Sequence, residues 1–305
     1  MKSKLGYSKF KLLLRKFGHL EFIRFGLRDR LIRIFHSPDT ATKEKFSVNF
    51  YGLKYPGELS CFLDWSVFYY GAYSKDELTI LGHLIQASCG ENILDIGANI
   101  GHHSLFFSTF EKNVHAFEPF EGVSRKLEEK IHVNNVKNIT LHKIALGEKN
   151  ETQTFYPSDN NNTGTGSFVN TKTKAKPLIF QIFKGDEFLA TRNIKNIGLI
   201  KIDVEGLEID VIKGLKDTLT KERPIVFFEW TQGNLSAENL SSNSLQNELF
   251  PQDYDFFAFI PSHPKFFLLS NRKTKLQKLQ KLHHGFNFEN LVAVPKEIRL
   301  PQQIL

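Results

Sequence analysis

The run Asn-Ile-Leu-Asp-Ile-Gly-Ala-Asn-Ile-Gly at residues 92–101 constrains the fold of this chain more than any other segment. It joins a short apolar strand to a glycine turn, and the residues after the turn predict a helix. This order is typical of the ligand edge of an α/β sheet, where the backbone comes close to a nucleotide-like cofactor. The free amides at the start of such a helix attract a carboxylate or a phosphate. We therefore expect Gly97, Asn99 and Gly101 to contact a cofactor.

The spacing of these glycines argues against a dinucleotide-binding turn. Gly97 and Gly101 are four residues apart, without the G-x-G-x-x-G pattern of such turns. Asp95 precedes the turn, so its carboxylate would repel a pyrophosphate and attract the ammonium and sulfonium groups of S-adenosylmethionine. Two interpretations of Asp95 stay open: contact with that cofactor, or hydrogen bonds from the backbone amides of the turn.

A second strand, predicted over residues 113–117, is followed by an acid where the ribose of a cofactor would lie. Glu118 comes 17 residues after Gly101, close to the offset of roughly 20 residues at which an acid binds ribose hydroxyls in related folds. A carboxylate can accept two hydrogen bonds from a ribose diol. An exposed acid before the Pro119 turn is the simpler alternative.

Helices and strands continue to alternate. A helix over residues 120–134 precedes a third strand over residues 139–146, and this βαβαβ order predicts a parallel sheet with right-handed crossovers. Ala145 would then lie at the carboxyl edge of the third strand, against the adenine of the cofactor. An ordinary position in the core explains Ala145 equally well.

Two further strands end in acids. Asp203 and Glu205 follow an apolar strand over residues 197–202, and Glu229 ends a strand over residues 224–230. Because ligands bind at the carboxyl ends of parallel strands, we expect the three carboxylates to converge. Like charges held together raise the pKa of at least one carboxyl group, which favours a general base for a hydroxyl acceptor. A divalent cation, or a structural role for one acid, stays an alternative, but no additional ligand set predicts a metal site.

Three segments resemble the motifs of the FkbM family of S-adenosylmethionine-dependent methyltransferases. They are Asp-Ile-Gly-Ala-Asn-Ile-Gly at 95–101, Phe-Glu-Pro at 117–119 and Ile-Lys-Ile-Asp-Val-Glu-Gly at 200–206. The third is the most specific, and the resemblance spans roughly residues 46–296. It implies a Rossmann-like, class I methyltransferase fold: a seven-stranded, mostly parallel sheet with a C-terminal antiparallel strand pair and helices on both faces.

The resemblance also implies a reaction. We expect an S-adenosylmethionine-dependent O-methyltransferase that modifies a hydroxyl of a carbohydrate, such as a surface glycan or its precursor, or of a related metabolite. One departure, Gly-Asp-Glu-Phe-Leu at residues 185–189 where many members carry Thr-Leu-Asp, leaves the acceptor subgroup open. Two other classes of function stay as alternatives: a Rossmann-type NAD(P)-dependent oxidoreductase, and a non-catalytic domain that binds a cofactor.

The first 36 residues carry most of the positive charge. They contain ten Lys or Arg against two acids, while the whole chain has a net charge of +7, so the remainder is nearly neutral. We therefore expect no nucleic acid partner. Residues 1–45 are predicted to form a basic amphipathic helical arm with an apolar stripe at helical spacing. The stripe consists of Leu13, Phe17, Leu20, Ile23, Leu27, Leu31 and Ile34. It would lie on an anionic membrane, or pack on the domain or on a second copy in a homodimer.

Residues 46–305 form the predicted methyltransferase domain, in which residues 46–88 cover the site. Aromatic residues of this cover segment would wall the acceptor pocket or pack in a small β layer. They are Trp65, Tyr69, Tyr70 and Tyr73. His102 and His103, which open the helix after the glycine turn, are candidates for acceptor contact or simply polar surface residues.

Two polar stretches lie farther along the chain. The loop at residues 158–167 brings Gly166 and Ser167 as candidates beside the acceptor, with hairpin chemistry as the alternative. Strands over residues 254–260 and 290–295 predict an antiparallel pair. The basic connection between them, which contains Arg272, Lys273, Lys275, Lys278 and Lys281, is expected to be a solvated loop or to bind an anionic acceptor.

Cysteine content indicates the compartment. Cys61 and Cys89 form neither a C-x-x-C pair nor a disulfide framework, which favours a reducing environment. We expect a cytoplasmic protein, with peripheral contact to the inner face of the membrane as the alternative that the basic arm allows. No apolar run approaches the roughly 20 residues needed to span a bilayer.

Overall fold

The computed structural model describes residues 8–157, 166–167, 176–204, 206–230, 249–260, 274–279 and 290–305. Its helices are α1 (Lys9–Gly18), α2 (Phe25–Phe35), α3 (Phe62–Tyr70), α4 (Lys75–Ala87), α5 (His102–Phe107), α6 (Glu121–Asn134), α7 (Gly185–Thr191), α8 (Glu208–Gly214) and α9 (Lys216–Lys221). Its strands are β1 (Lys45–Phe50), β2 (Leu53–Glu58), β3 (Asn92–Ile96), β4 (Asn113–Phe117), β5 (Ile139–His142), β6 (Ala145–Gly147), β7 (Glu151–Pro157), β8 (Gly166–Ser167), β9 (Leu178–Lys184), β10 (Ile197–Ile202), β11 (Ile225–Glu229), β12 (Tyr254–Ile260), β13 (Lys275–Lys278) and β14 (Asn290–Pro295).

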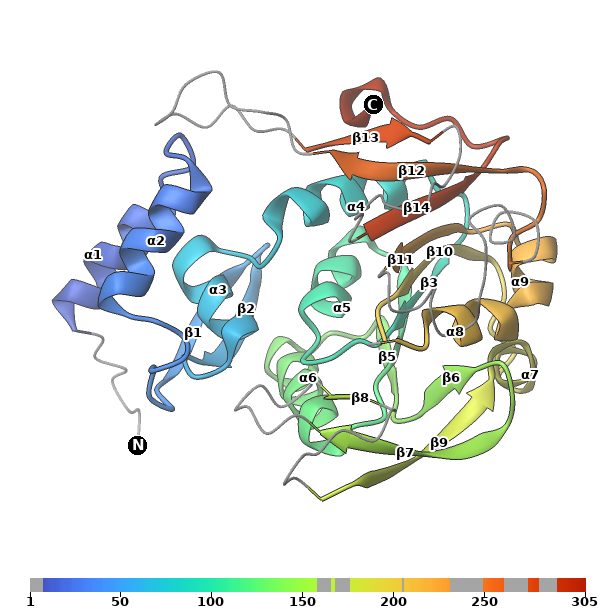
Figure 1. Ribbon diagram of the computed structural model, residues 1–305, viewed down its shortest axis with the longest axis horizontal. Coiled ribbons are helices and arrows are strands. Elements are labelled where there is room, and N and C mark those ends of the chain that lie inside the picture. The colour runs from blue at the N-terminus through green and yellow to red at the C-terminus, as the bar shows by residue number, and fades with distance from the viewer. Residues whose placement is uncertain are drawn as a thin grey trace.

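A large mixed sheet forms the centre of the molecule (Figure 1). Its strand order is β13-β12-β14-β11-β10-β3-β4-β5. The strands from β11 to β5 run parallel, and β14, β12 and β13 run antiparallel at the other end. The Rossmann-like α/β arrangement with a C-terminal antiparallel addition is therefore confirmed.

Helices cover both faces of this sheet because its parallel strands are apolar on both sides. Neighbouring residues of one strand point to opposite faces. Ile93 packs in one core with α4 and α5, whereas Leu94 packs in a second core with α7 and α8. Strands buried on both faces read as continuous apolar runs, as residues 197–202 do.

The expected number of strands was wrong by one. The described part of the sheet has eight strands, because β13 pairs with β12 at the edge where a solvated loop was expected. Leu276 is buried, while Lys275, Gln277 and Lys278 are exposed. Lysines on an edge strand keep it from pairing with another chain, and they also give the segment the appearance of a loop in the sequence.

The predicted third strand divides into two. β5 ends at His142, and after two residues β6 leaves the large sheet and pairs in parallel with β9. β6, β9, β7 and β8 form a separate four-stranded sheet. Gly166 and Ser167 form β8 opposite residues 156–157 of β7, so their backbone takes part in a hairpin.

The N-terminal arm consists of two helices where one continuous stripe was predicted. α1 and α2 lie at one end of the long axis of the molecule (Figure 1). Their buried residues are Leu14 and Gly18 of α1 and Arg28 and Ile32 of α2. None of these four belongs to the predicted stripe, although Phe17 of the stripe is partly buried and packs against the core.

Candidate functional site

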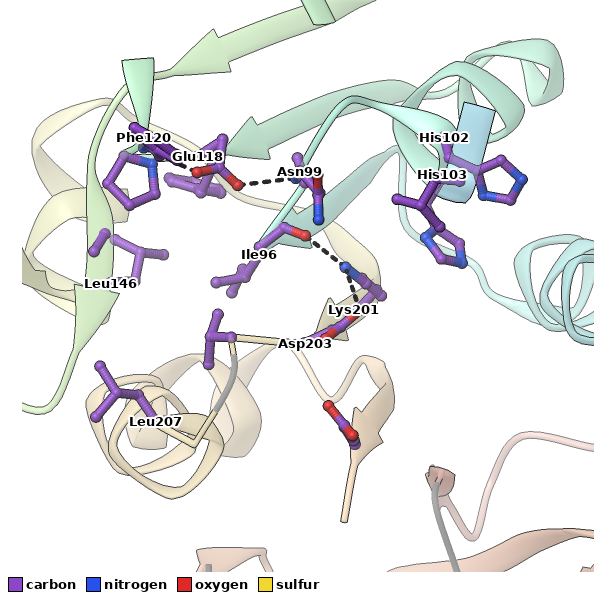
Figure 2. Close-up of a pocket in the computed structure, with 18 of the residues that line it drawn as sticks. Ile96, Asn99, His102, His103, Glu118, Phe120, Leu146, Lys201, Asp203 and Leu207 are labelled. Carbon is purple, nitrogen blue, oxygen red and sulfur yellow. Dashed lines mark hydrogen bonds and ion pairs between the residues drawn. The ribbon is translucent and has the colours of Figure 1, made fainter. Parts of the chain in front are cut away.

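A cavity of about 490 Å³ opens at the carboxyl edge of the parallel strands (Figure 2). The strands end level with one another: Ile96 pairs with Phe117 and Ile202, and Ile202 pairs with Phe228. The residues directly after them therefore reach the same space. Six of the nine predicted site residues line the cavity, namely Gly97, Asn99, Glu118, Ala145, Asp203 and Glu229.

The turn after β3 touches the turn after β10. Gly97 adopts a φ of +78°, and a Cβ atom there would lie 1.8 Å from the carbonyl oxygen of Asp203. Only glycine allows this approach. Asn99 also has a positive φ of +50°, and its side-chain Oδ1 accepts a hydrogen bond of 2.8 Å from the amide of Ile100. The turn is thus shaped before any ligand binds.

Glu118, directly after β4, is hydrogen-bonded to this turn. Its two carboxylate oxygens accept hydrogen bonds of 2.9 Å from the backbone amides of Asn99 and Phe120 (Figure 2). The side chain is buried, and burial raises the pKa of Glu118 to about 7 although the amides oppose that shift. Each oxygen keeps a further acceptor site, so the residue fits the predicted contact with a ribose diol.

Asp95 lies beneath the cavity and is not among the residues that line it. It is fully buried, and its carboxylate accepts a hydrogen bond of 2.5 Å from the hydroxyl of Ser104. The Nζ atom of Lys201 lies 3.3 Å from the other Asp95 oxygen. The structure therefore gives Asp95 a buried cation of this protein as its partner, where the sequence suggested the cationic end of a cofactor or the amides of the turn.

Lys201 connects Asp95 to Asp203. Its Nζ donates a hydrogen bond of 2.7 Å to the carbonyl of Gly97 and lies 3.4 Å from Asp203 Oδ2. Burial disfavours the charge of Lys201, but the carboxylates of Asp203 and Asp95 outweigh it and raise the pKa of the ammonium group. Lys201 was not among the predicted site residues. It pairs with Asp95 in the β3–β10 register, and a lone lysine in an apolar strand is the signal for such a buried pair.

Gly101 and Ala145 differ in their relation to the cavity. Gly101 is absent from the lining, and a Cβ atom there would lie 2.3 Å from Leu127 of α6. The absence of a side chain at this position permits close packing against α6 and a φ of +85°. Ala145 lines the cavity next to Leu146, which leaves an apolar surface where an adenine was expected.

The side of the cavity where the acceptor is expected from the sequence combines carboxylates with amide and imidazole groups. Asp203 and Glu229 both line it, whereas Glu205 lies outside the described residues. A buried glutamate shapes the turn that carries Asp203, because Glu208 Oε1 accepts hydrogen bonds of 3.0 and 3.1 Å from the amides of Val204 and Gly206. Among the described residues, no three His, Cys, Asp or Glu side chains form a group that could hold a metal ion.

A second polar group faces this acceptor side, and the sequence indicated only part of it. His103 Nε2 lies 3.0 Å from Glu77 Oε1, and Asn290 donates a hydrogen bond of 3.0 Å to Glu77 Oε2. All three residues line the cavity. Glu77 and Asn290 were missed because they are 213 residues apart in the chain, and no local pattern marks either one.

His102 has a different role from its neighbour. It is 2% exposed, and its Nε2 accepts a hydrogen bond of 3.2 Å from the backbone amide of Tyr73. Burial holds the pKa of His102 well below its ordinary value, so the ring is neutral. His102 thus joins α5 to the cover segment.

Most of the predicted aromatic wall is core. Trp65 and Tyr69 are fully buried and Tyr70 is nearly so, which supports the alternative of packing. Tyr73 lines the cavity, together with Phe62 at the start of α3. The rings of Tyr73 and Phe62 lie edge to face at 5.7 Å, so the cover segment gives the acceptor side an apolar surface.

Comparison with known proteins agrees with this architecture. The model of the methyltransferase FkbM domain matches residues 95–263, more than half of the chain. Hexuronic acid methyltransferase AglP of Haloferax volcanii is 29% identical over 146 residues, which are 48% of this chain and 59% of that protein. The 2-O-methyltransferase NoeI of Sinorhizobium fredii is 27% identical over 159 residues, 47% of this chain and 64% of that protein. The chain thus matches less than two thirds of the length of each.

Among solved structures, the methyltransferase FkbM from Methylobacillus flagellatus covers 67% of this chain and 43% of its own, with 16% identity and a TM-score of 0.40. The family match covers the glycine turn after β3, Glu118, the Lys201–Asp203 edge and Glu229. The chain belongs to the FkbM family of methyltransferases.

Proposed function

We propose that this protein is an S-adenosylmethionine-dependent O-methyltransferase whose acceptor is a hydroxyl of a carbohydrate, such as a surface glycan or its precursor, or of a related metabolite. One observation carries the proposal: the glycine turn with Glu118 and the acids Asp203 and Glu229 line the same cavity. The names of two relatives, a hexuronic acid methyltransferase and a 2-O-methyltransferase, support a sugar hydroxyl as the acceptor.

The donor half of the cavity suits S-adenosylmethionine. Gly97 and Asn99 would hold its amino acid end, Glu118 its ribose, and Ala145 with Leu146 its adenine. When bound, this cofactor supplies an electrophilic methyl group. Two features of the cavity fit this cofactor. The backbone at Gly97 leaves no room for a side chain, and the buried carboxylate of Glu118 keeps acceptor sites for further hydrogen bonds.

The chain itself must remove a proton from the acceptor. We assign this role to Asp203, whose side chain is 41% exposed and faces the cavity from the end of β10. Lys201 Nζ, 3.4 Å from Asp203 Oδ2, would orient this carboxylate, and Glu229 would bind the attacking hydroxyl or a neighbouring one. Glu205 stays a sequence prediction for the same role. A positioned base contributes about 10²- to 10⁴-fold in rate.

The acceptor half offers several hydrogen-bonding groups and an aromatic surface, as a sugar requires. His103, Glu77 and Asn290 would bind ring hydroxyls, while Tyr73 and Phe62 would stack on the apolar face of the ring.

Two free thiols, a buried one at Cys61 and an exposed one at Cys89, support a cytoplasmic location for the reaction.

Calorimetry and a single substitution test the proposal. We expect the chain to bind S-adenosylmethionine and not NAD; tight binding of NAD with no response to the methyl donor would contradict it. Asp203→Asn should keep the donor Kd within about threefold and lower methyl transfer to an identified acceptor by about 10²-fold or more. Asp217→Asn, an exposed acid of α9, is the matched control. Mass spectrometry of glycans from cells with and without the protein identifies the acceptor.

A further inference from the structure

The N-terminal arm carries an unusual share of the exposed apolar surface. Thirteen large hydrophobic residues are exposed in the described chain, and nine of them lie between residues 10 and 35. We call these nine the outward apolar face of the arm. They are Phe10, Leu12, Leu13, Leu20, Phe22, Phe25, Leu31, Ile34 and Phe35. Scattered apolar residues are normal on a protein surface, but a concentration of this kind marks an interaction site.

The spacing of these residues places them together. Phe10 and Leu13 are three apart on α1, while Leu31, Ile34 and Phe35 follow helical spacing on α2. The rings of Phe10 and Phe35 lie edge to face at 5.5 Å, so the two helices present a continuous apolar surface. The most exposed of the nine, Ile34 at 68% and Leu13 at 63%, also belong to the stripe predicted from the sequence.

The opposite side of the arm packs on α3. A Cβ atom at Gly18 would lie 2.2 Å from the carbonyl of Tyr69 in α3, and Ile32 is fully buried. Arg15 Nε donates a hydrogen bond of 2.9 Å to the carbonyl of Phe68. The arm is therefore held on α3 by one side, at one end of the molecule (Figure 1). Its outward apolar face is exposed, with Phe25 also in edge-to-face contact with Tyr70 of α3.

The positive charge of the arm indicates which kind of partner binds its outward apolar face. Residues 8–36 contain eight Lys or Arg and only two acids, and both acids are engaged: Glu21 with Lys75, and Asp29 with Arg33. Lys9, Lys16, Arg24 and Arg30 have no ion pair with any described residue. A second copy of the chain would bring the same positive charge to the contact, whereas anionic lipid headgroups would neutralise it.

We propose that the outward apolar face is a docking surface for an anionic lipid bilayer. Its Leu, Ile and Phe side chains enter the boundary between headgroups and acyl chains, and the surrounding Lys and Arg side chains reach the headgroups. α1 and α2 are each about 15 Å long and lie in the plane of the interface. No helix of the described chain is long and apolar enough to cross a membrane, so the contact is peripheral.

The docked arm touches the cover of the cavity. The guanidinium group of Arg33 lies 5.4 Å from the ring centre of Phe62, and Phe62 lines the cavity. Trp65, one turn farther along α3, donates a hydrogen bond of 3.2 Å to the carbonyl of His36 after α2. A bilayer under the arm would therefore bring membrane-bound acceptors close to the acceptor side of the cavity.

Co-sedimentation of the full chain with vesicles tests the docking surface, and it needs neither methyl donor nor acceptor. We expect binding to vesicles that contain phosphatidylglycerol, weak binding to pure phosphatidylcholine, and loss of binding at high salt. The triple variant Phe22→Ser, Ile34→Ser, Phe35→Ser should lower the partition coefficient by about tenfold or more, since each side chain loses its transfer into lipid. Lys16→Glu with Arg30→Glu should lower it similarly.

The controls distinguish docking on lipid from nonspecific adhesion, misfolding and dimerisation. Ile179→Ser removes an exposed apolar side chain of β9, 73% exposed and outside the arm, and should leave vesicle binding unchanged. Circular dichroism and thermal unfolding verify that each variant is folded. Equal binding by the triple variant, or no binding to anionic vesicles by the wild type, overturns the proposal. So does sedimentation velocity that shows a dimer in the wild type and a monomer in the triple variant, because a second copy would then occupy the face.

Discussion

The Nζ atom of Lys201 lies 3.4 Å from Oδ2 of Asp203, so the acid that we assign as the base is held by a buried cation. The same Nζ lies 3.3 Å from Asp95 Oδ1. A single ammonium group thus compensates a fully buried carboxylate and orients an accessible one. We therefore expect Lys201 to contribute to both stability and activity, and the contribution to stability can be measured separately.

Removing the ammonium group should destabilise the fold. Lys201→Met leaves Asp95 buried with no countercharge, and we expect the free energy of unfolding in urea to fall by about 3–5 kcal/mol. Lys216→Met, at an exposed position of α9, is the control and should stay within about 0.5 kcal/mol of the wild type. The double variant Lys201→Met, Asp95→Asn should lose less than the sum of the single variants, because it removes both charges. A single Lys201→Met variant as stable as the control would contradict this role.

Donor binding should depend on pH through Glu118. Its pKa of about 7 means that the carboxylate is progressively protonated as the pH falls below 7, and a protonated carboxyl loses acceptor capacity for the ribose hydroxyls. Calorimetry should show the Kd for S-adenosylmethionine rising as the pH falls through 7, by up to about tenfold per pH unit, and levelling off at higher pH. Glu118→Gln should bind more weakly and show no such dependence; a variant that kept the wild-type slope would assign the titration to another group.

The pair formed by His103 and Glu77 should act on acceptor affinity alone. His103 uses Nε2 for Glu77, and its Nδ1 has no hydrogen-bond partner among the described residues. We expect His103→Ala to raise the KM for the acceptor by about tenfold or more, the effect of one lost hydrogen bond to a polar ligand, with an unchanged donor Kd. His83→Ala in α4 is the matched histidine control. If the donor Kd rose as much as the acceptor KM, His103 would belong to the donor half.

Two glycines should respond to alanine in opposite directions. At Gly101, a positive φ and the 2.3 Å approach to Leu127 mean that Ala forces strain and overpacking, with an expected loss of about 2–4 kcal/mol. At Gly26, inside α2, an added Cβ meets nothing within 4 Å, and Ala should stabilise the chain by about 0.5–1 kcal/mol. Thermal unfolding of the two variants should move their Tm values apart. An unchanged or higher Tm for Gly101→Ala would refute the assignment for Gly101, and a lower Tm for Gly26→Ala would refute that for Gly26.

The sequence allowed the prediction of elements whose signals are local. The strands expected over residues 113–117, 197–202, 224–230, 254–260 and 290–295 and the helix over residues 120–134 lie within a residue or two of their observed bounds. The strand expected over residues 139–146 divides into β5 and β6. Because parallel strands end level, the prediction that Glu118, Asp203 and Glu229 share an edge followed from their place after the strands.

What could not be predicted depends on partners far away in the chain. Glu77 meets Asn290 only after the cover segment and β14 have packed on the sheet. Helical spacing identified the apolar stripe of the arm, but spacing does not indicate whether that stripe packs on the protein or is exposed. Its least buried members, Ile34 and Leu13, face outward, while Leu14 and Ile32 make the contact with the protein.

The contact between Gly97 and Asp203 has a further consequence for specificity. Because the two turns touch through backbone atoms, a change in either turn would shift both the proposed donor half and the proposed base. The cover segment meets the rest of the protein through hydrogen bonds that include the Tyr73 amide to His102 and Asn290 of β14 to Glu77. Under the proposed function, substitutions in the cover segment would change which acceptor is bound and leave the donor half intact, so acceptor choice and methyl transfer would diverge separately.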